Sequence, residues 1–255
     1  AYDIDVICQF KNGNLTSEEI RNSLISALND SEVYNDKIKE WPKCFTLEYA
    51  KFGDFDFSID LVPTILDENP NICGKNISEK YLINVLKIAT KESKYDWYTI
   101  NPKGYQIWFN DINSRFALYN RENRMRSLFE ANKQIYASVE DIPEYFNKSS
   151  LQEAIQILKR SRDIYFSKIH KEDNKPASII ITTFVALIAN NSSTDIDSID
   201  LVFNVLKELN YYSSDELYSK IVSPIIKKDG KWEFFNPVNG KDNLLDSWNK
   251  DKENA

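Results

Sequence analysis

Alternation of polar and apolar residues is the first pattern in the chain, and it predicts a β-strand over residues 2–10 (YDIDVICQF). Thr16 then precedes Glu19 by three positions, which is the signature of a capping box and predicts a helix over residues 17–29. The first half of the chain is therefore expected to mix strands with helices. Two more strands are expected over residues 44–50 and 55–65, joined by a turn at Gly53 and Asp54.

Helical patterns dominate the second half. Ser150 and Glu153 form a second capping box ahead of a long helix over residues 151–169. Pro176 is expected at the first position of an apolar helix that ends near residue 189. The sequence also predicts a helix at 79–90, a short strand or buried segment at 104–109, a charged amphipathic stretch at 116–138, helices at 195–210 and 214–222, and an aromatic, asparagine-rich end at 231–249.

This mixture of elements predicts the α+β fold class. We expect a boundary near residue 115, between a mixed part, residues 1–115, and a mostly helical part, residues 116–255. No stretch approaches 18 consecutive apolar residues, so no segment is expected to span a membrane. The cysteines are too widely and irregularly spaced for a disulfide framework or a zinc site, which favours a reducing cytoplasm. They are Cys8, Cys44 and Cys73.

Charge narrows the range of partners. The formal net charge is −7 and the pI is about 5.0, and basic residues gather only in short clusters such as Arg121, Arg124 and Arg126. Because neutralisation of phosphates drives the binding of duplex DNA or RNA, an extensive nucleic-acid surface is not expected. The single histidine, His170, makes histidine-based catalysis improbable. The chain begins at Ala1 rather than Met, and we expect it to be a piece of a longer protein.

Three aspartates are the candidate catalytic residues. Asp3 and Asp5 are two positions apart in the first strand, so their side chains are expected on one face, with Ile4 and Val6 directed into a core. Asp60 interrupts an apolar strand, where an isolated buried charge is costly. If the two strands are neighbours, the three carboxylates converge. Such a cluster repels itself unless it binds cations, and magnesium prefers carboxylate and phosphate oxygens.

A simpler interpretation stays open for these aspartates. An Asp-x-Asp pair is common, and a strand with alternating polar residues often only has a solvated face. Asp54 and Asp56 are not candidates, because Asp54 belongs to the expected turn and Asp56 lies nearer the start of its strand.

The order of strand with Asp-x-Asp, helix, hairpin and strand with a third aspartate resembles the nucleotidyltransferases of the DNA-polymerase-β superfamily. Three later segments resemble, more narrowly, the SMODS-domain nucleotidyltransferases, which are the bacterial CD-NTases related to cGAS. The segments are 151–166 (LQEAIQILKRSRDIYF), 175–183 (KPASIIITT) and 236–248 (NPVNGKDNLLDSW). The resemblance covers nearly the whole chain. It implies a polymerase-β-like palm over residues 1–115 and a helical domain over residues 116–255 that closes the nucleotide cleft.

The resemblance also implies roles for individual residues. Asp3, Asp5 and Asp60 would be catalytic and would hold two Mg²⁺ ions, which Mn²⁺ can replace. Lys159 matches a lysine that contacts the donor triphosphate, and Ser178 falls in the first helical turn, where free N–H groups favour phosphate. Taken without the family, the pattern favours a plain surface lysine at Lys159, and for Ser178 a simple cap-region serine fits equally well. The Gly-Ser loop that precedes the Asp-x-Asp strand in the family is not in this sequence.

The activity that the resemblance implies is synthesis of cyclic di- or trinucleotides from NTPs, ATP among them, in anti-phage defence (CBASS). The product would act on a downstream effector, and the resemblance allows a HORMA-type activator protein. Two alternatives stay open at this point. One is another polymerase-β-like transferase, and the other is a non-catalytic nucleotide-binding or interaction protein.

Overall fold

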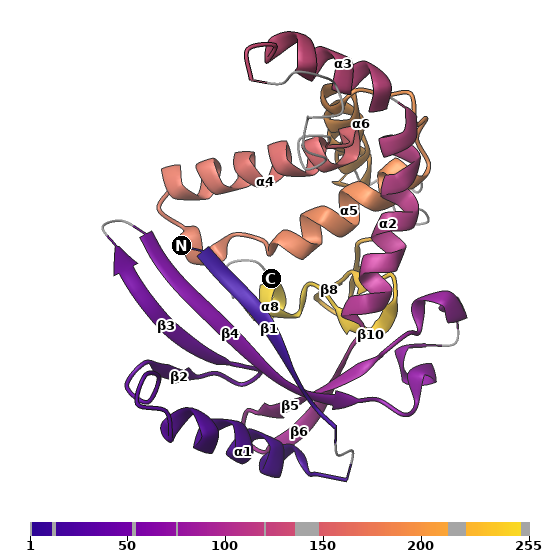
Figure 1. Ribbon diagram of the computed structural model, residues 1–255. Helices are drawn as coiled ribbons and strands as arrows, with labels where there is room; N and C mark the ends of the chain where they lie inside the picture. The colour runs from indigo at the N-terminus through magenta and orange to yellow at the C-terminus, as the bar shows by residue number, and fades with distance from the viewer. Residues whose placement is uncertain are drawn as a thin grey trace. The chain divides into compact units, whose positions relative to one another are not determined.

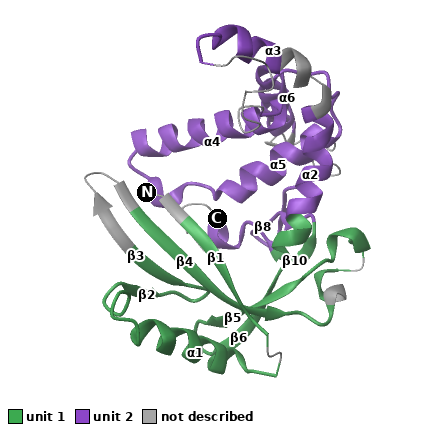
Figure 2. Cartoon of the chain, in the orientation of Figure 1, with its two compact units in different colours: residues 1–105, 238–242 green, residues 106–237, 243–255 purple. Residues whose placement is uncertain are grey.

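The computed structural model of the chain describes residues 2–11, 14–52, 55–74, 76–119, 121–135, 148–213 and 223–250. The chain divides into two compact units, coloured separately in Figure 2. Unit 1 comprises residues 1–105 and 238–242, and unit 2 comprises residues 106–237 and 243–255. The chain thus leaves unit 1 after Tyr105 and returns to it for one short segment near its end.

In the part of the chain that the structure describes, unit 1 is built on a six-stranded mixed sheet (Figure 1). The strands are β1 (Tyr2–Phe10), β2 (Ile38–Glu40), β3 (Phe45–Phe52), β4 (Phe55–Leu66), β5 (Leu86–Lys91) and β6 (Tyr95–Ile100). The order is β2-β3-β4-β5-β6, and β1 pairs with β4 in parallel. The long strand β4 therefore joins β1, β3 and β5 into one sheet.

Helix α1 (Ser17–Asn29) supplies the core on one face of this sheet. The expected capping box is confirmed: the Thr16 hydroxyl accepts from the Glu19 N–H at 3.2 Å, and Glu19 accepts in turn from the Thr16 N–H at 2.7 Å. The apolar side of α1 packs at Ile20 and Leu28 in two clusters. One cluster contains Ile20, Ile65 and Ala89, and the other contains Leu28, Phe45 and Leu47 with Ile59 and Leu61 beside them.

A buried arginine fastens α1 to the sheet. The guanidinium of Arg21 donates to the carbonyls of Pro42, Trp41 and Ala89 at 2.8–3.1 Å, and to the Glu40 carboxylate at 2.8 Å. Arg21 is 1% exposed, so its charge is stabilised almost wholly by these partners. The contacts join the loop between β2 and β3 to β5, which is not a neighbour of either strand in the sheet.

Two predictions for unit 1, one for residues 79–90 and one for the first strand, were wrong. The helix expected over residues 79–90 is a short 3-10 turn, η2 (Glu79–Tyr81), followed by β5. A short apolar run does not distinguish a helix from a doubly buried strand, and pairing of β5 with both β4 and β6 decides it. Ile4 and Val6 were expected in a core, but they are 48% and 38% exposed because β1 pairs only with β4 among the described strands.

The expectation of a strand or buried segment at residues 104–109 was also wrong, because these residues lie within α2 (Pro102–Tyr119). Asn101 begins this helix: its Oδ1 accepts from the Gly104 N–H at 3.0 Å, and Pro102 takes the first helical position. Gly104 has no room for a side chain, since a Cβ there would lie 2.0 Å from the carbonyl oxygen of Tyr81. The boundary expected near residue 115 falls inside α2.

Unit 2 is mostly helical. It contains the rest of α2 and α3 (Arg121–Ala131), α4 (Ser150–Lys168), η4 (Glu172–Asn174), α5 (Ser178–Asn190), α6 (Ser198–Ser213) and α8 (Asp246–Lys250). Short strands occur near the end of the chain: β7 (Ile226–Lys228), β8 (Lys231–Glu233), β9 (Phe235–Asn236) and β10 (Asn239–Asn243), the last of which enters unit 1. Buried residues of α4, α5 and α6 form the core, among them Leu151, Phe184 and Leu201. The α+β fold class is thus confirmed.

The long helix α4 begins one residue earlier than predicted, because Ser149 and Gln152 form the capping box instead of Ser150 and Glu153. Both pairs satisfy the sequence pattern, so it could not separate them. A hydrogen bond from the Ser149 hydroxyl to Asn113 on α2 favours the observed pair. Helix α5 begins at Ser178, so Pro176 precedes the helix by two residues instead of opening it. The predicted helix 214–222 and the Gly53-Asp54 turn lie outside the described residues.

Candidate functional site

The first group of candidate residues lies on two neighbouring strands. In the parallel pair of β1 and β4, Asp5 is the register partner of Asp60, and Asp3 is the partner of Ser58. Register partners on adjacent strands direct their side chains to the same face of a sheet. The backbone therefore brings the positions of Asp3, Asp5 and Asp60 to one face, although the side chain of Asp3 lies outside the described part.

This carboxylate face is the one that α1 does not cover. Ile59 and Leu61, which flank Asp60 along β4, pack in the α1 core on the opposite face. Alternation along the strand therefore turns Asp60 away from the apolar core, where its charge would be expensive to bury. Asp5 is exposed and Asp60 is half-buried.

Strand β3 adds polar groups to the same face. Thr46 is the register partner of Asp60 in the antiparallel pair of β3 and β4, and its hydroxyl donates to Asp60 Oδ1 at 2.5 Å. Glu48, the partner of Ser58, is a further carboxylate on this face, and Lys39 on β2 forms an ion pair with it at 2.5 Å. Neither Thr46 nor Glu48 was predicted from the sequence. Their alternation with Phe45 and Leu47 was a signal, but the pairing register was needed to place them beside Asp60.

The two aspartates also act together on a neighbouring thiol. Burial raises the pKa of Cys44, and the negative charges of Asp60 and Asp5 raise it further. Both carboxylates therefore contribute to one local negative potential at the end of β3. A negative potential in a half-buried site favours binding of a cation.

The described residues fit a magnesium site in their chemistry. Asp5 and Asp60 offer hard oxygen ligands from adjacent strands, and magnesium proteins commonly supply one or two carboxylates while substrate phosphates complete the coordination. Among the described side chains, which do not include that of Asp3, no three His, Cys, Asp or Glu residues gather as a metal site. A cation held by Asp5 and Asp60 would therefore take its remaining ligands from outside the described side chains, for example from water.

The second group of candidate residues lies in unit 2. Lys159 is half-buried on α4, and burial lowers the pKa of its ammonium, with the nearby positive charge of Arg162 lowering it further. Ser178 is exposed in the first turn of α5. Asp5 and Asp60 belong to unit 1, so the two groups of candidates lie in different units.

Arg162 links these two positions and was not predicted from the sequence. It lies one helical turn after Lys159, and its Nη1 donates to the Pro176 carbonyl at 2.7 Å and to the Ser178 hydroxyl at 3.2 Å. Its side chain is 9% exposed and forms an ion pair with Asp163 at 2.7 Å. The pattern of the long helix contained no signal for this role, because the contact depends on where the chain returns after the helix.

Comparison with known proteins gives one curated relative and a recurring fold. No family model matches the chain. It is 29% identical over 249 residues to the c-di-GMP synthase of Roseivirga ehrenbergii, which covers 97% of this chain and 55% of that relative. The chain therefore spans about half the length of the relative.

Solved structures share the fold. The Bradyrhizobium diazoefficiens CD-NTase CdnG, in complex with GTP, has a TM-score of 0.60 at 19% identity, covering 99% of this chain and 66% of CdnG. The Elizabethkingia meningoseptica CdnE cyclic dinucleotide synthase, with GTP and Apcpp, has a TM-score of 0.50 at 12% identity, covering 82% and 62%. No helix in the described part of the chain combines the length and hydropathy needed to cross a membrane.

Proposed function

We propose that this chain, which has the polymerase-β-like fold of the bacterial CD-NTases, is the nucleotidyltransferase part of a cyclic dinucleotide synthase. One observation carries the proposal: Asp5 and Asp60 are register partners on the face of the sheet that α1 does not cover. The likeness in sequence to a c-di-GMP synthase supports cyclic dinucleotide synthesis and GTP as a substrate. We propose ATP as a second substrate. In this proposal residues 1–115 are the palm and residues 116–255 are the helical domain.

In the proposed reaction, a ribose hydroxyl of the acceptor nucleotide attacks the α-phosphorus of the donor. A new P–O bond forms, the bond between the α- and β-phosphates breaks, and pyrophosphate leaves. Asp3, Asp5 and Asp60 would hold Mg²⁺, which lowers the pKa of the attacking hydroxyl and neutralises charge on the phosphates when it is bound. Asp60 accepts the proton or orients the hydroxyl, and Thr46 fixes the carboxylate of Asp60 through its hydrogen bond.

We assign Lys159 and Ser178 to the triphosphate. A half-buried ammonium on α4 and a hydroxyl beside the free N–H groups of the first turn of α5 are both suited to phosphate oxygens. Arg162 would hold the start of α5 in place and add positive charge. Repeating the transfer on the linear intermediate closes the ring.

The direct test is incubation of the full-length protein with labelled ATP and GTP and Mg²⁺, followed by mass spectrometry of the product. We expect a cyclic dinucleotide and two pyrophosphates per ring, and we expect EDTA to abolish both. Asp60→Asn should lower the rate by at least about 100-fold, while Asp36→Asn, an exposed aspartate of unit 1, should leave it unchanged. Linear products without any cyclic product would assign the chain to another polymerase-β-like transferase instead.

The cellular role is a further part of the proposal. We propose that the product signals to an effector in cytoplasmic anti-phage defence and that a HORMA-type protein activates synthesis. Phage plating on cells that carry the intact locus, compared with the same locus bearing Asp60→Asn, tests the defence role. Equal plating on both would argue against it. A stimulation of product formation by the co-expressed activator tests the second part.

The alternative of a non-catalytic nucleotide-binding protein makes a different prediction. Such a protein would bind NTPs without releasing pyrophosphate, and Asp60→Asn would leave its affinity largely intact. Pyrophosphate release from the wild-type protein that is lost in Asp60→Asn excludes it.

A further inference from the structure

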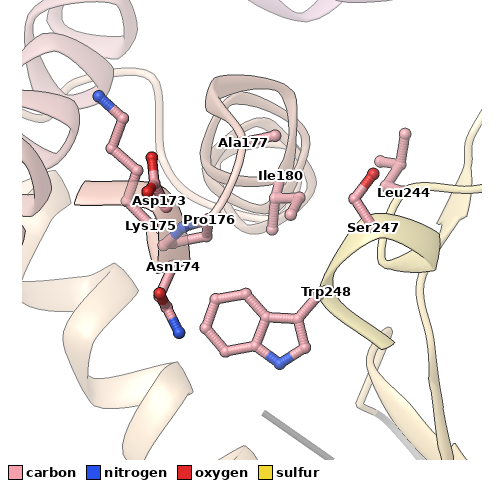
Figure 3. Close-up of a pocket in the computed structure, with 9 residues that line it drawn as sticks. All are labelled: Asp173, Asn174, Lys175, Pro176, Ala177, Ile180, Leu244, Ser247 and Trp248. Carbon is pink, nitrogen blue, oxygen red and sulfur yellow. The ribbon is translucent and has the colours of Figure 1, made fainter. Parts of the chain in front are cut away.

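A pocket in unit 2 lies between α8 and the segment that precedes α5 (Figure 3). It has a cavity volume of about 110 Å³. The residues that matter for its chemistry are Asn174, Pro176, Ile180, Leu244, Ser247 and Trp248. Figure 3 shows the indole of Trp248 pointing from α8 toward Asn174 and Pro176 across the pocket. The pocket therefore has one broad aromatic wall and an opposite wall with both apolar and amide groups.

The aromatic wall is held rigidly by asparagines. The side-chain amide of Asn249, next to Trp248, accepts from the backbone N–H of Trp232 at 2.9 Å and donates to the backbone carbonyl of Trp232 at 2.7 Å. Asn243, which precedes α8, accepts from the N–H of Phe234 at 2.9 Å and from that of Leu245 at 3.2 Å. Asn249 near the end of α8 and Asn243 just before its start are thus both hydrogen-bonded to backbone groups, which fixes the helix at each end. The asparagine-rich end of the sequence thus holds the helix that presents Trp248 to the pocket.

The opposite wall, formed by the segment that precedes α5, is held in place by contacts with α4. Arg162 donates to the carbonyl of Pro176 at 2.7 Å, and Lys175 forms an ion pair with Asp163 at 3.5 Å. The segment between η4 and α5 is therefore tied to α4, and Pro176 itself restricts the backbone. A pocket between two fixed walls is ready to bind a flat ligand without a large loss of conformational entropy.

The chemistry of the lining selects the ligand. An indole face with Pro176, Ile180 and Leu244 offers apolar contact to both sides of a flat ring, while the amide of Asn174 and the hydroxyl of Ser247 can bond to polar atoms at its edge. Lys175, although paired with Asp163, and the nearby first turn of α5 favour an attached phosphate, while Asp173, which also lines the pocket, opposes it.

We propose that this pocket is a nucleobase site in which the base stacks on Trp248 and is bonded at its edge by Asn174 and Ser247. The inference rests on the proposed function for the identity of its ligand, a nucleoside triphosphate. It adds a base-binding role for Trp248, Asn174 and Ser247, for which the sequence alone predicted none.

Binding of α,β-methylene analogues of GTP and ATP to the full-length protein with Mg²⁺ tests the inference, because these analogues do not release pyrophosphate. Trp248→Ala should raise the Kd of at least one analogue by about 5- to 100-fold, which is the range expected when one base loses its stacking partner. Trp248→Phe should keep the Kd within about threefold, since a ring remains. Trp41→Ala removes a tryptophan that is 53% exposed in unit 1, and it should leave the Kd unchanged.

Ser247→Phe is the second variant, for the case that Trp248→Ala does not fold. Ser247 is exposed on α8, so a phenyl ring can be accommodated by the fold while it occupies the pocket. Its unfolding temperature should stay at the wild-type value while analogue binding weakens. A wild-type Kd in folded Trp248→Ala or in Ser247→Phe overturns the nucleobase site.

The two proposals fail in distinguishable ways. If the wild-type protein makes cyclic product and Trp248→Ala keeps the wild-type Kd, the nucleobase site is wrong and the proposed function stands. If no product forms with or without the co-expressed activator but Trp248→Ala weakens analogue binding, the proposed synthesis is wrong and the nucleobase site stands. If the wild-type protein neither binds the analogues nor forms product, both are wrong.

Discussion

Thr46 on β3 donates its hydroxyl hydrogen to Asp60 on β4 across 2.5 Å. The two residues are register partners, so the backbone pairing itself sets this contact. A carboxylate that accepts a bond from one side is limited to fewer orientations and keeps its second oxygen for a cation or a hydroxyl. Thr46 is therefore a positioning residue for the carboxylate that we propose as catalytic.

Replacement of Thr46 tests this role. Thr46→Val keeps the shape of the side chain but removes the donor, and we expect kcat to fall about 10- to 150-fold, since a hydrogen bond to a charged group contributes about 1.5–3 kcal/mol. Thr46→Ser restores the hydroxyl and should recover most of the rate. The check is the Mg²⁺ dependence of kcat for both variants. If Thr46→Ser is as slow as Thr46→Val, the hydroxyl does not act on Asp60.

Arg162 connects α4 to the start of α5, and its loss should affect substrate binding more than chemistry. A lysine keeps the charge but cannot reach both the Pro176 carbonyl and the Ser178 hydroxyl in the same geometry. We expect Arg162→Lys to raise the KM for NTPs roughly tenfold with a smaller change in kcat. Arg160→Lys is the matched control, since Arg160 is exposed on the same helix. An unchanged KM in Arg162→Lys would refute this role.

The half-buried ammonium of Lys159 should lower the free energy of unfolding, although we propose that it binds the triphosphate. Burial, and then the charge of Arg162, lowers its pKa in the folded protein below the ordinary value of 10.5. Below both pKa values the lysine is charged in the folded and unfolded states alike, so the folded state carries the full cost of the buried charge. The cost is relieved as the pH rises through the folded pKa toward 10.5.

Lys159→Met should therefore raise the unfolding temperature at pH 7 while it weakens NTP binding. The difference from wild type should shrink as the pH rises through the lowered pKa of Lys159 toward 10.5, which thermal melts across a pH series will show. Lys207→Met, at an exposed position of α6, should show no such trend. A lower unfolding temperature for Lys159→Met at pH 7 would mean that the buried ammonium stabilises the fold, contrary to this prediction.

Arg21 should be among the most important single residues for the stability of unit 1. Arg21→Met removes the guanidinium donor from the carbonyls of Pro42, Trp41 and Ala89, and we expect a loss of about 3–5 kcal/mol in the free energy of unfolding, since each buried polar group that loses a partner costs about 1–3 kcal/mol. Glu40→Gln should cost less than about 1 kcal/mol, because the side chain of Glu40 is 44% exposed. Urea unfolding of both variants gives the comparison. Equal losses would mean that the ion pair outweighs the carbonyl contacts.

Local patterns determined much of unit 1 from the sequence alone. The strand with Asp-x-Asp, the helix begun by Thr16 and Glu19, and the strand that carries Asp60 each depend on neighbours within four residues, and all three are confirmed. By the same alternation along β4, Asp60 faces away from Ile59 and Leu61, which pack in the α1 core. Such features follow from backbone geometry and capping, which the sequence contains in full.

The tertiary structure decided what local pattern could not. The apolar run at β5 satisfied a helix and a strand equally, and only pairing with β4 and β6 selected the strand. The partnership of Asp5 with Asp60, the donation of Thr46 to Asp60 and the bond of Arg162 to Ser178 join residues 14 to 55 positions apart. Their physical cause is the register of the strands and the return path of the chain, which arise only when the whole core packs.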